Sequence, residues 1–87
     1  MGVHLDEIKE AVIDGKHKEI EDLVKAAIEN NVDTSRIVND GMIAAMDVVG
    51  KRFSENKIFV PEMLVSAFTM KKGLALINPL LKGRENE

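Results

Sequence analysis

The chain has 87 residues, of which 45% are hydrophobic, 31% are charged and 3% are aromatic, and its formal net charge is −3. This length fits one small domain, and the apolar content is too high for a disordered tail. The acidic balance excludes a general electrostatic attraction to nucleic acid or anionic lipid, and the absence of cysteine excludes disulfides and thiolate sites.

Two amphipathic segments open the chain and predict helices over about residues 3–14 and 16–29. Apolar residues recur at spacings of three and four in both segments, and each has a charged opposite face. Gly15 suits the left-handed backbone conformation that ends many helices, and Asn30-Asn31 ends the second segment. Helices of this kind cover a core with one face.

Two longer segments follow and predict helices over about residues 33–55 and 61–81. Asp33 is a good N-cap residue for the first, because its carboxylate can accept a hydrogen bond from an early backbone N–H. Pro61 suits the first turn of the second, where its missing N–H costs nothing. Pro79 lacks a donor and restricts the residue before it, so we expect it to bend or end that helix after Ile77.

The sequence predicts an all-α fold, because it contains no strict period-2 alternation. Four helices with short connections imply an antiparallel four-helix bundle. We expect Met42, Met46, Phe59 and Phe68 in its core. The fourth helix carries one apolar stripe, consisting of Met63, Ala67, Met70, Leu74 and Ile77.

The connection between the third and fourth helices is unusually apolar. Loops normally run over the protein surface, so large apolar residues there need a partner. These residues are Phe53, Ile58, Phe59, Val60 and Met63.

Residues 40–81 also contain a series of short motifs in a fixed order. The series is Gly41-Met42, Val49-Gly50, Phe53, Phe59-Val60 before Pro61-Glu62, then Ser66-Ala67 and Met70-Lys71. This pattern resembles the helical N-terminal cap domain of cobalamin (corrinoid)-binding methyl-carrier proteins. Such domains occur in cobalamin-dependent methionine synthase and in the corrinoid proteins of methanol and methylamine methyltransferase systems.

The resemblance implies a function and a contact site. In that family the cap is a four-helix bundle that shields the upper face of a methylcobalamin, which a following Rossmann-like domain holds. The cap positions that lean on the corrinoid match Phe53, Val60 and Met63, and Val60 stands where the family often has leucine. The implied role is a non-catalytic module of a methyltransferase system, whose partners are the corrinoid-binding domain and methyltransferase subunits or domains.

The resemblance also implies what this chain lacks. The corrinoid-binding domain of the family carries an Asp-x-His-x-x-Gly motif whose histidine ligates cobalt, and this chain reaches Glu87 without such a motif. We therefore expect a piece of a longer corrinoid protein rather than a stand-alone cap. We expect the isolated piece to be free of cofactor.

Two alternatives stay open at this stage. The apolar patch around residues 53–63 could instead mediate homodimerisation or docking to an unrelated protein. Asp14, His17 and Glu21 are spaced to share a helix face and bind a metal, although a solvated charge cluster explains them more simply.

No catalytic triad or glycine-rich phosphate loop is present. We expect a cytoplasmic protein, because neither a membrane-length apolar run nor a signal peptide occurs.

Overall fold

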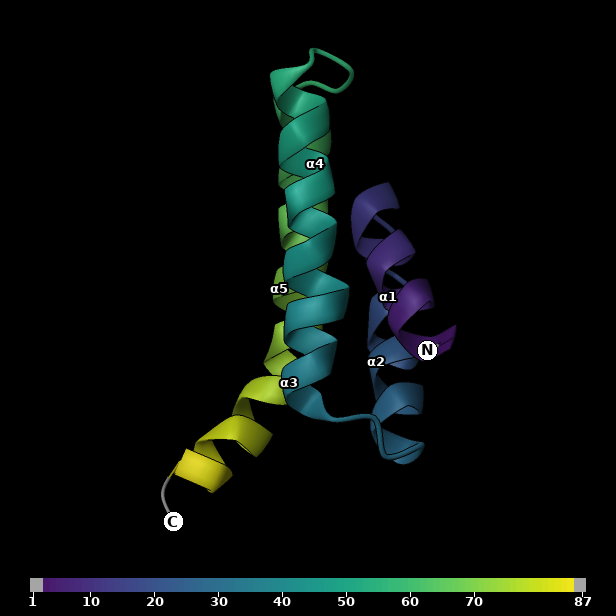
Figure 1. Cartoon of the computed structure of the whole chain (residues 1–87), viewed down its shortest axis with the longest axis vertical. Helices are drawn as coiled ribbons and strands as arrows, with labels where there is room; N and C mark the ends of the chain where they lie inside the picture. The colour runs from purple at the N-terminus through teal and green to yellow at the C-terminus, as the bar shows by residue number, and fades with distance from the viewer. Residues whose placement is uncertain (1–2, 86–87) are drawn as a thin grey trace.

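The computed structural model of the chain describes residues 3–85, with side chains through residue 80. It consists of helices α1 (Val3–Asp14), α2 (Ile20–Glu29), α3 (Thr34–Arg36), η1 (Ile37–Ile43), α4 (Ala44–Ser54) and α5 (Val60–Glu85). The segments α3, η1 and α4 follow one another without a break and form a single rod. Figure 1 shows this rod and α5 as a long hairpin, with α1 and α2 packed beside part of its length. The prediction of an all-α, antiparallel four-helix bundle is confirmed.

Three helices end in the same way, through a residue with positive φ. Gly15, Asn31 and Asn56 have φ values of 70°, 63° and 62°. At each of them the backbone N–H groups of that residue and the next one bond back to carbonyls of the last helical turn. This arrangement satisfies carbonyls that a helix end would otherwise leave unpaired. The expectation for Gly15 and for the end at Asn30-Asn31 is met.

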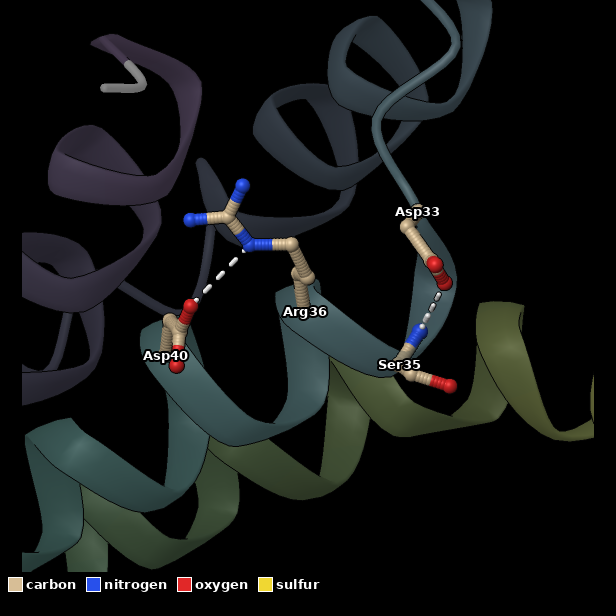
Figure 2. A network of polar contacts seen from close by, with 4 residues as sticks. All are labelled: Asp33, Ser35, Arg36 and Asp40. Carbon is tan, nitrogen blue, oxygen red and sulfur yellow. Dashed lines mark hydrogen bonds and ion pairs between the residues drawn. The ribbon is translucent and has the colours of Figure 1, made fainter.

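The third helix begins as its sequence predicts. Figure 2 shows the Asp33 carboxylate accepting a hydrogen bond from the backbone N–H of Ser35, at 2.8 Å. Arg36, which follows Ser35 directly, pairs with Asp40 one turn later, and its Nε lies 3.1 Å from Asp40 Oδ2 in an exposed ion pair. The cap accounts for the sharp start of the helix, whereas an exposed pair of this kind contributes only about 0.5 kcal/mol.

A wide turn lies inside this rod, and the sequence does not predict it. Residues Ile37–Ile43 form a π-helical segment, which brings Gly41 directly against α1. A Cβ added at Gly41 would lie 3.1 Å from Ile8 Cγ2, so glycine permits the close approach. Apolar spacing does not distinguish a π-helical turn from an α-helical one over so few residues.

The core lies where α1 and α2 face the hairpin. Met42 is fully buried and Met46 packs against the same cluster, as predicted. Gly73 of α5 permits a close approach, because a Cβ added there would lie 2.6 Å from Met42 Cε and 3.2 Å from Ile20 Cγ1. The buried cluster consists of Leu5, Ile8, Ala11, Val12, Ile20, Val24, Ala27, Ile37, Met42, Ala45 and Ile77.

Two helix boundaries differ from the predicted ones. Residues 16–19 form a turn, so α2 begins at Ile20 rather than at residue 16. Helix α5 passes through Pro79 and ends at Glu85, beyond its predicted end near residue 81, so Pro79 does not end the helix. Figure 1 shows the last turns of α5, in yellow, leaning away from the rest of the helix. A proline removes one backbone hydrogen bond and crowds the preceding turn, which bends a helix without requiring that it end.

Candidate functional site: an apolar corner between α4 and α5

The loop between α4 and α5 lies at one end of the molecule, beyond the end of α1 (Figure 1). The apolar side chains around it form what we call the apolar corner. Phe53 lies in the last turn of α4, and Phe59, Val60, Met63 and Leu64 lie just before or within the first turns of α5. Neither α1 nor α2 covers this end of the hairpin, so its apolar side chains reach the surface.

The structure leaves all three predicted contact residues accessible. Phe53 is 38% exposed, Val60 is 48% exposed and Met63 is half-buried. Side chains enclosed by their own bundle would have no surface to offer a ligand. Outward apolar surface at this corner is therefore present, as a contact role requires.

Two aromatic residues that the sequence places in the core are exposed instead. Phe59 is 69% exposed and Phe68 is 50% exposed, so the prediction that they are buried is wrong. The buried face of α5 is centred on small residues, namely Ser66, Thr69 and Gly73, before it reaches Ile77. Close packing of α5 against its neighbours needs small side chains at the contact, and the large ones are turned outward.

Ser66 lies one turn beyond the contact residues on α5 and is buried. It is only 2% exposed. Its hydroxyl donates a hydrogen bond to the carbonyl of Ile13 at 3.2 Å, across to the last turn of α1. Ser66 therefore ties α5 to α1 and has no part in the exposed surface.

The backbone around the corner is fully organised. Asn56 N–H bonds to Phe53 O at 3.0 Å and Lys57 N–H to Arg52 O at 2.8 Å, which ends α4. Phe59 N–H donates to Glu62 Oε1 at 2.9 Å, which is half of a capping box at the start of α5. Phe59 thus occupies an N-cap position, where Ser, Thr, Asp or Asn would stabilise the helix better. The residue at this position therefore does not optimise the start of α5.

A cavity of about 330 Å³ lies between this end of the hairpin and the end of α1. Val49, Ile58 and Val65 contribute apolar walls, and the charged groups around it belong to Asp14, Arg52 and Glu62. Among residues 3–80, whose side chains the structure describes, no group of three or more His, Cys, Asp or Glu is placed to hold a metal ion. Asp14, His17 and Glu21 therefore do not meet as a set, and the ring of His17 instead packs against Phe68.

The corner has a simple chemistry. Its side chains are apolar and none of them titrates, so it can exclude water from a surface laid against it. It offers no general acid or base.

In the part of the chain that the structure describes, no helix is both long and apolar enough to cross a membrane.

Comparison with known proteins identifies the class to which this bundle belongs. The solved structure of the Methanosarcina barkeri monomethylamine corrinoid protein matches with a TM-score of 0.91 at 24% sequence identity. The match covers 97% of this chain and 40% of that one, and it shows a shared fold. The sequence profile of the B12 binding domain family matches residues 4–78. The chain therefore belongs to the B12 binding domain family.

Curated relatives agree with this assignment. A corrinoid protein of Desulfitobacterium hafniense (strain Y51) is 36% identical over 75 residues, which are 86% of this chain and 35% of that protein. The trimethylamine corrinoid protein of Methanosarcina barkeri is 28% identical over 79 residues, which are 91% of this chain and 36% of that protein. The chain thus spans about a third of the length of these relatives.

Proposed function

We propose that the chain is the helical cap of a corrinoid protein in methyl transfer. In this proposal Phe53, Val60 and Met63 face the upper side of a corrinoid such as cobalamin, which a Rossmann-like domain holds. The observation that carries the proposal is the accessible apolar corner on a chain of the B12 binding domain family. Methyltransferase subunits or domains are the further partners.

The residues at the corner fit one face of a corrin ring. A bound corrinoid supplies a cobalt centre that carries a methyl group between a donor and an acceptor. Phe53 and Val60 offer no ligating atom, and the thioether of Met63 is a soft, weak acceptor. Apolar side chains of this kind exclude water and nucleophiles from the surface that they cover without competing for the metal. The module therefore protects and does not catalyse.

A protective contact must also be able to open. The three side chains belong to two neighbouring helix ends, so the contact that they make is small. Binding has to overcome the loss of translational and rotational freedom, which so small a contact cannot do alone. The isolated chain accordingly has little affinity for a free corrinoid. The same property lets the cap move aside when a methyltransferase approaches.

The proposal can be tested in a chimaera. This chain replaces the matching segment of the 36% identical Desulfitobacterium hafniense corrinoid protein, and the chimaera is loaded with methylcobalamin. We expect Phe53→Ala with Val60→Ala to accelerate photolysis of the cobalt–methyl bond several-fold, because a thinner apolar cover lets the products of photolysis move apart more easily.

Ile43→Ala is the matched control, because Ile43 is an exposed aliphatic residue remote from the corner in sequence. It should leave the photolysis rate unchanged. Equal rates for the unaltered chimaera and the double variant would show that the corner does not shield the methyl group.

A further inference from the structure

The first turn of α5 is closed by hydrogen bonds that meet at a single residue, Phe59. The N–H of Phe59 donates to Oε1 of the Glu62 side chain at 2.9 Å. The carbonyl of Phe59 accepts from the backbone N–H groups of Glu62 and Met63, at 3.0 and 3.1 Å. Val60 lies inside the loop that the Glu62 side chain closes. The two proposed contact residues of α5, Val60 and Met63, therefore take their positions from this turn.

Packing contributes little to holding this turn. The side chains of Phe59, Val60 and Leu64 are all exposed. A tie to the rest of the bundle comes one turn later, where the hydroxyl of Ser66 donates to the carbonyl of Ile13. Most helical stability in proteins comes from the packing of a buried face. A turn whose side chains are exposed depends more strongly on the hydrogen bonds that cap it.

Glu62 supplies the side-chain part of this cap. In a complete capping box, the N-cap side chain also accepts a hydrogen bond from the helix. The side chain of Phe59 has no acceptor atom, so it cannot make that second bond. Pro61 assists by fixing its own φ at a helical value. The Glu62 carboxylate is exposed, and its negative charge is favourable near the start of a helix.

We propose that Glu62 is a positioning residue for the apolar corner. By accepting the Phe59 N–H, its carboxylate keeps the first turn of α5 closed and fixes where Val60 and Met63 face. Glu62 acts on the shielding of a corrinoid only through these two side chains. The effect on shielding rests on the proposed function, whereas the effect on the turn holds without a corrinoid.

The first measurement uses the 87-residue chain without a corrinoid. Hydrogen exchange of the Met63 amide reports opening of the turn, because this N–H bonds to the Phe59 carbonyl and not to the Glu62 side chain. We expect Glu62→Ala to lower the protection factor of this amide about fivefold, which corresponds to the loss of a typical N-terminal cap. Glu62→Gln should retain the protection, because a glutamine oxygen can accept the same bond. Both variants remove the charge, so the difference between them isolates the hydrogen bond.

The second measurement uses the methylcobalamin-loaded chimaera. Glu62→Ala should accelerate photolysis of the cobalt–methyl bond by no more than about fivefold, because the cover is lost only while the turn is open. Glu62→Gln should react at the rate of the unaltered chimaera. The circular dichroism of both variants should remain that of the folded chain, since the Glu62 side chain is exposed.

Asp33→Ala is the matched control for a general loss of stability. The Asp33 carboxylate also caps a helix, by accepting the Ser35 N–H at 2.8 Å, but it does so at the start of the rod whose other end carries the corner. We expect this variant to lose a comparable cap. It should change neither the protection factor of the Met63 amide nor the photolysis rate.

Three results would overturn the proposal. The first is an unchanged Met63 protection factor in Glu62→Ala, and the second is an equal change in Asp33→Ala. The third is an unchanged photolysis rate in Glu62→Ala, while Phe53→Ala with Val60→Ala accelerates photolysis. If that double variant also leaves the rate unchanged, the cap function fails, and the protection factor alone decides whether Glu62 holds the turn.

Discussion

The two halves of α5 differ in what surrounds them, although they belong to one helix. Along the second half, Gly73 and Ile77 lie buried against α2 and the rest of the core. At the first turns, Val60 is 48% exposed and Leu64 is 59% exposed. The difference separates two roles for apolar residues. In the second half of α5, which we call the covered half, apolar residues stabilise the bundle. In the first half, which we call the bare half, they remain exposed and available for contact with another molecule.

The largest expected effect lies in the covered half. Ile77 is fully buried, so Ile77→Ala removes several packed methyl and methylene groups and leaves a cavity. We expect it to lower the free energy of unfolding by about 3 kcal/mol. Leu64→Ala, which also truncates a large aliphatic residue of α5, should change it by less than about 0.5 kcal/mol. Urea unfolding followed by circular dichroism measures the free energy of unfolding of both variants. Similar losses of stability at the two positions would contradict the distinction between the halves.

A smaller effect follows from the close contact at Gly73. A valine there would displace the end of the Met42 side chain, whose Cε lies 2.6 Å from an added Cβ, and would crowd Ile20 and Val24 at 3.2 and 3.4 Å. We expect Gly73→Val to lower the free energy of unfolding by about 2 kcal/mol. Gly50→Ala is the control, because an added Cβ at Gly50 meets nothing within 4 Å. It should stabilise the chain by about 0.5–1 kcal/mol, since alanine favours a helix more than glycine does. A destabilising Gly50→Ala would contradict this account of α4.

The smallest effect concerns the bare half and has the opposite sign. Phe59→Ser places a hydroxyl at the N-cap position of α5, where it can complete the capping box with Glu62. We expect the free energy of unfolding to rise by about 0.5–1 kcal/mol. Thermal unfolding checks the direction. A clear loss of stability would mean that Phe59 packs against the bundle after all, and that the corner contributes to the core.

Local signals in the sequence account for much of the fold. Amphipathic spacing predicts the helices, and Asp33, Gly15 and Asn30-Asn31 mark where they begin or end. These features depend on a few neighbouring residues, so single-sequence reasoning can detect them. Whether Pro79 bends α5 or ends it depends instead on how the whole helix packs, and apolar spacing does not distinguish the two outcomes.

The inner face of α5 shows why burial is harder to predict. Hydrophobicity favours Phe68 in the core, yet Ser66, Thr69 and Gly73 take that place because the helices approach closely. Whether a small residue is buried depends on the distance between helix axes, which no local pattern encodes. The π-helical turn around Gly41 is hidden for another reason, because apolar spacing over so few residues does not distinguish it from an α-helical turn.

One part of the candidate site is also predictable from the sequence, and another part is not. An excess of apolar residues around one turn predicts an exposed corner, and the structure places Phe53, Val60 and Met63 there with accessible surface. Their selection as corrinoid contacts comes from the resemblance of the motif to the family, and it stays a prediction. Leu64 also belongs to the corner. Its spacing of four residues from Val60 could have indicated this, because residues four apart share a helix face.

The most direct test is a crystal structure of the methylcobalamin-loaded chimaera described above. The account predicts that Phe53, Val60 and Met63 lie in van der Waals contact with the upper face of the corrin ring and exclude water from it. A structure in which the corner faces solvent or another protein surface, while different residues cover the ring, would contradict the account.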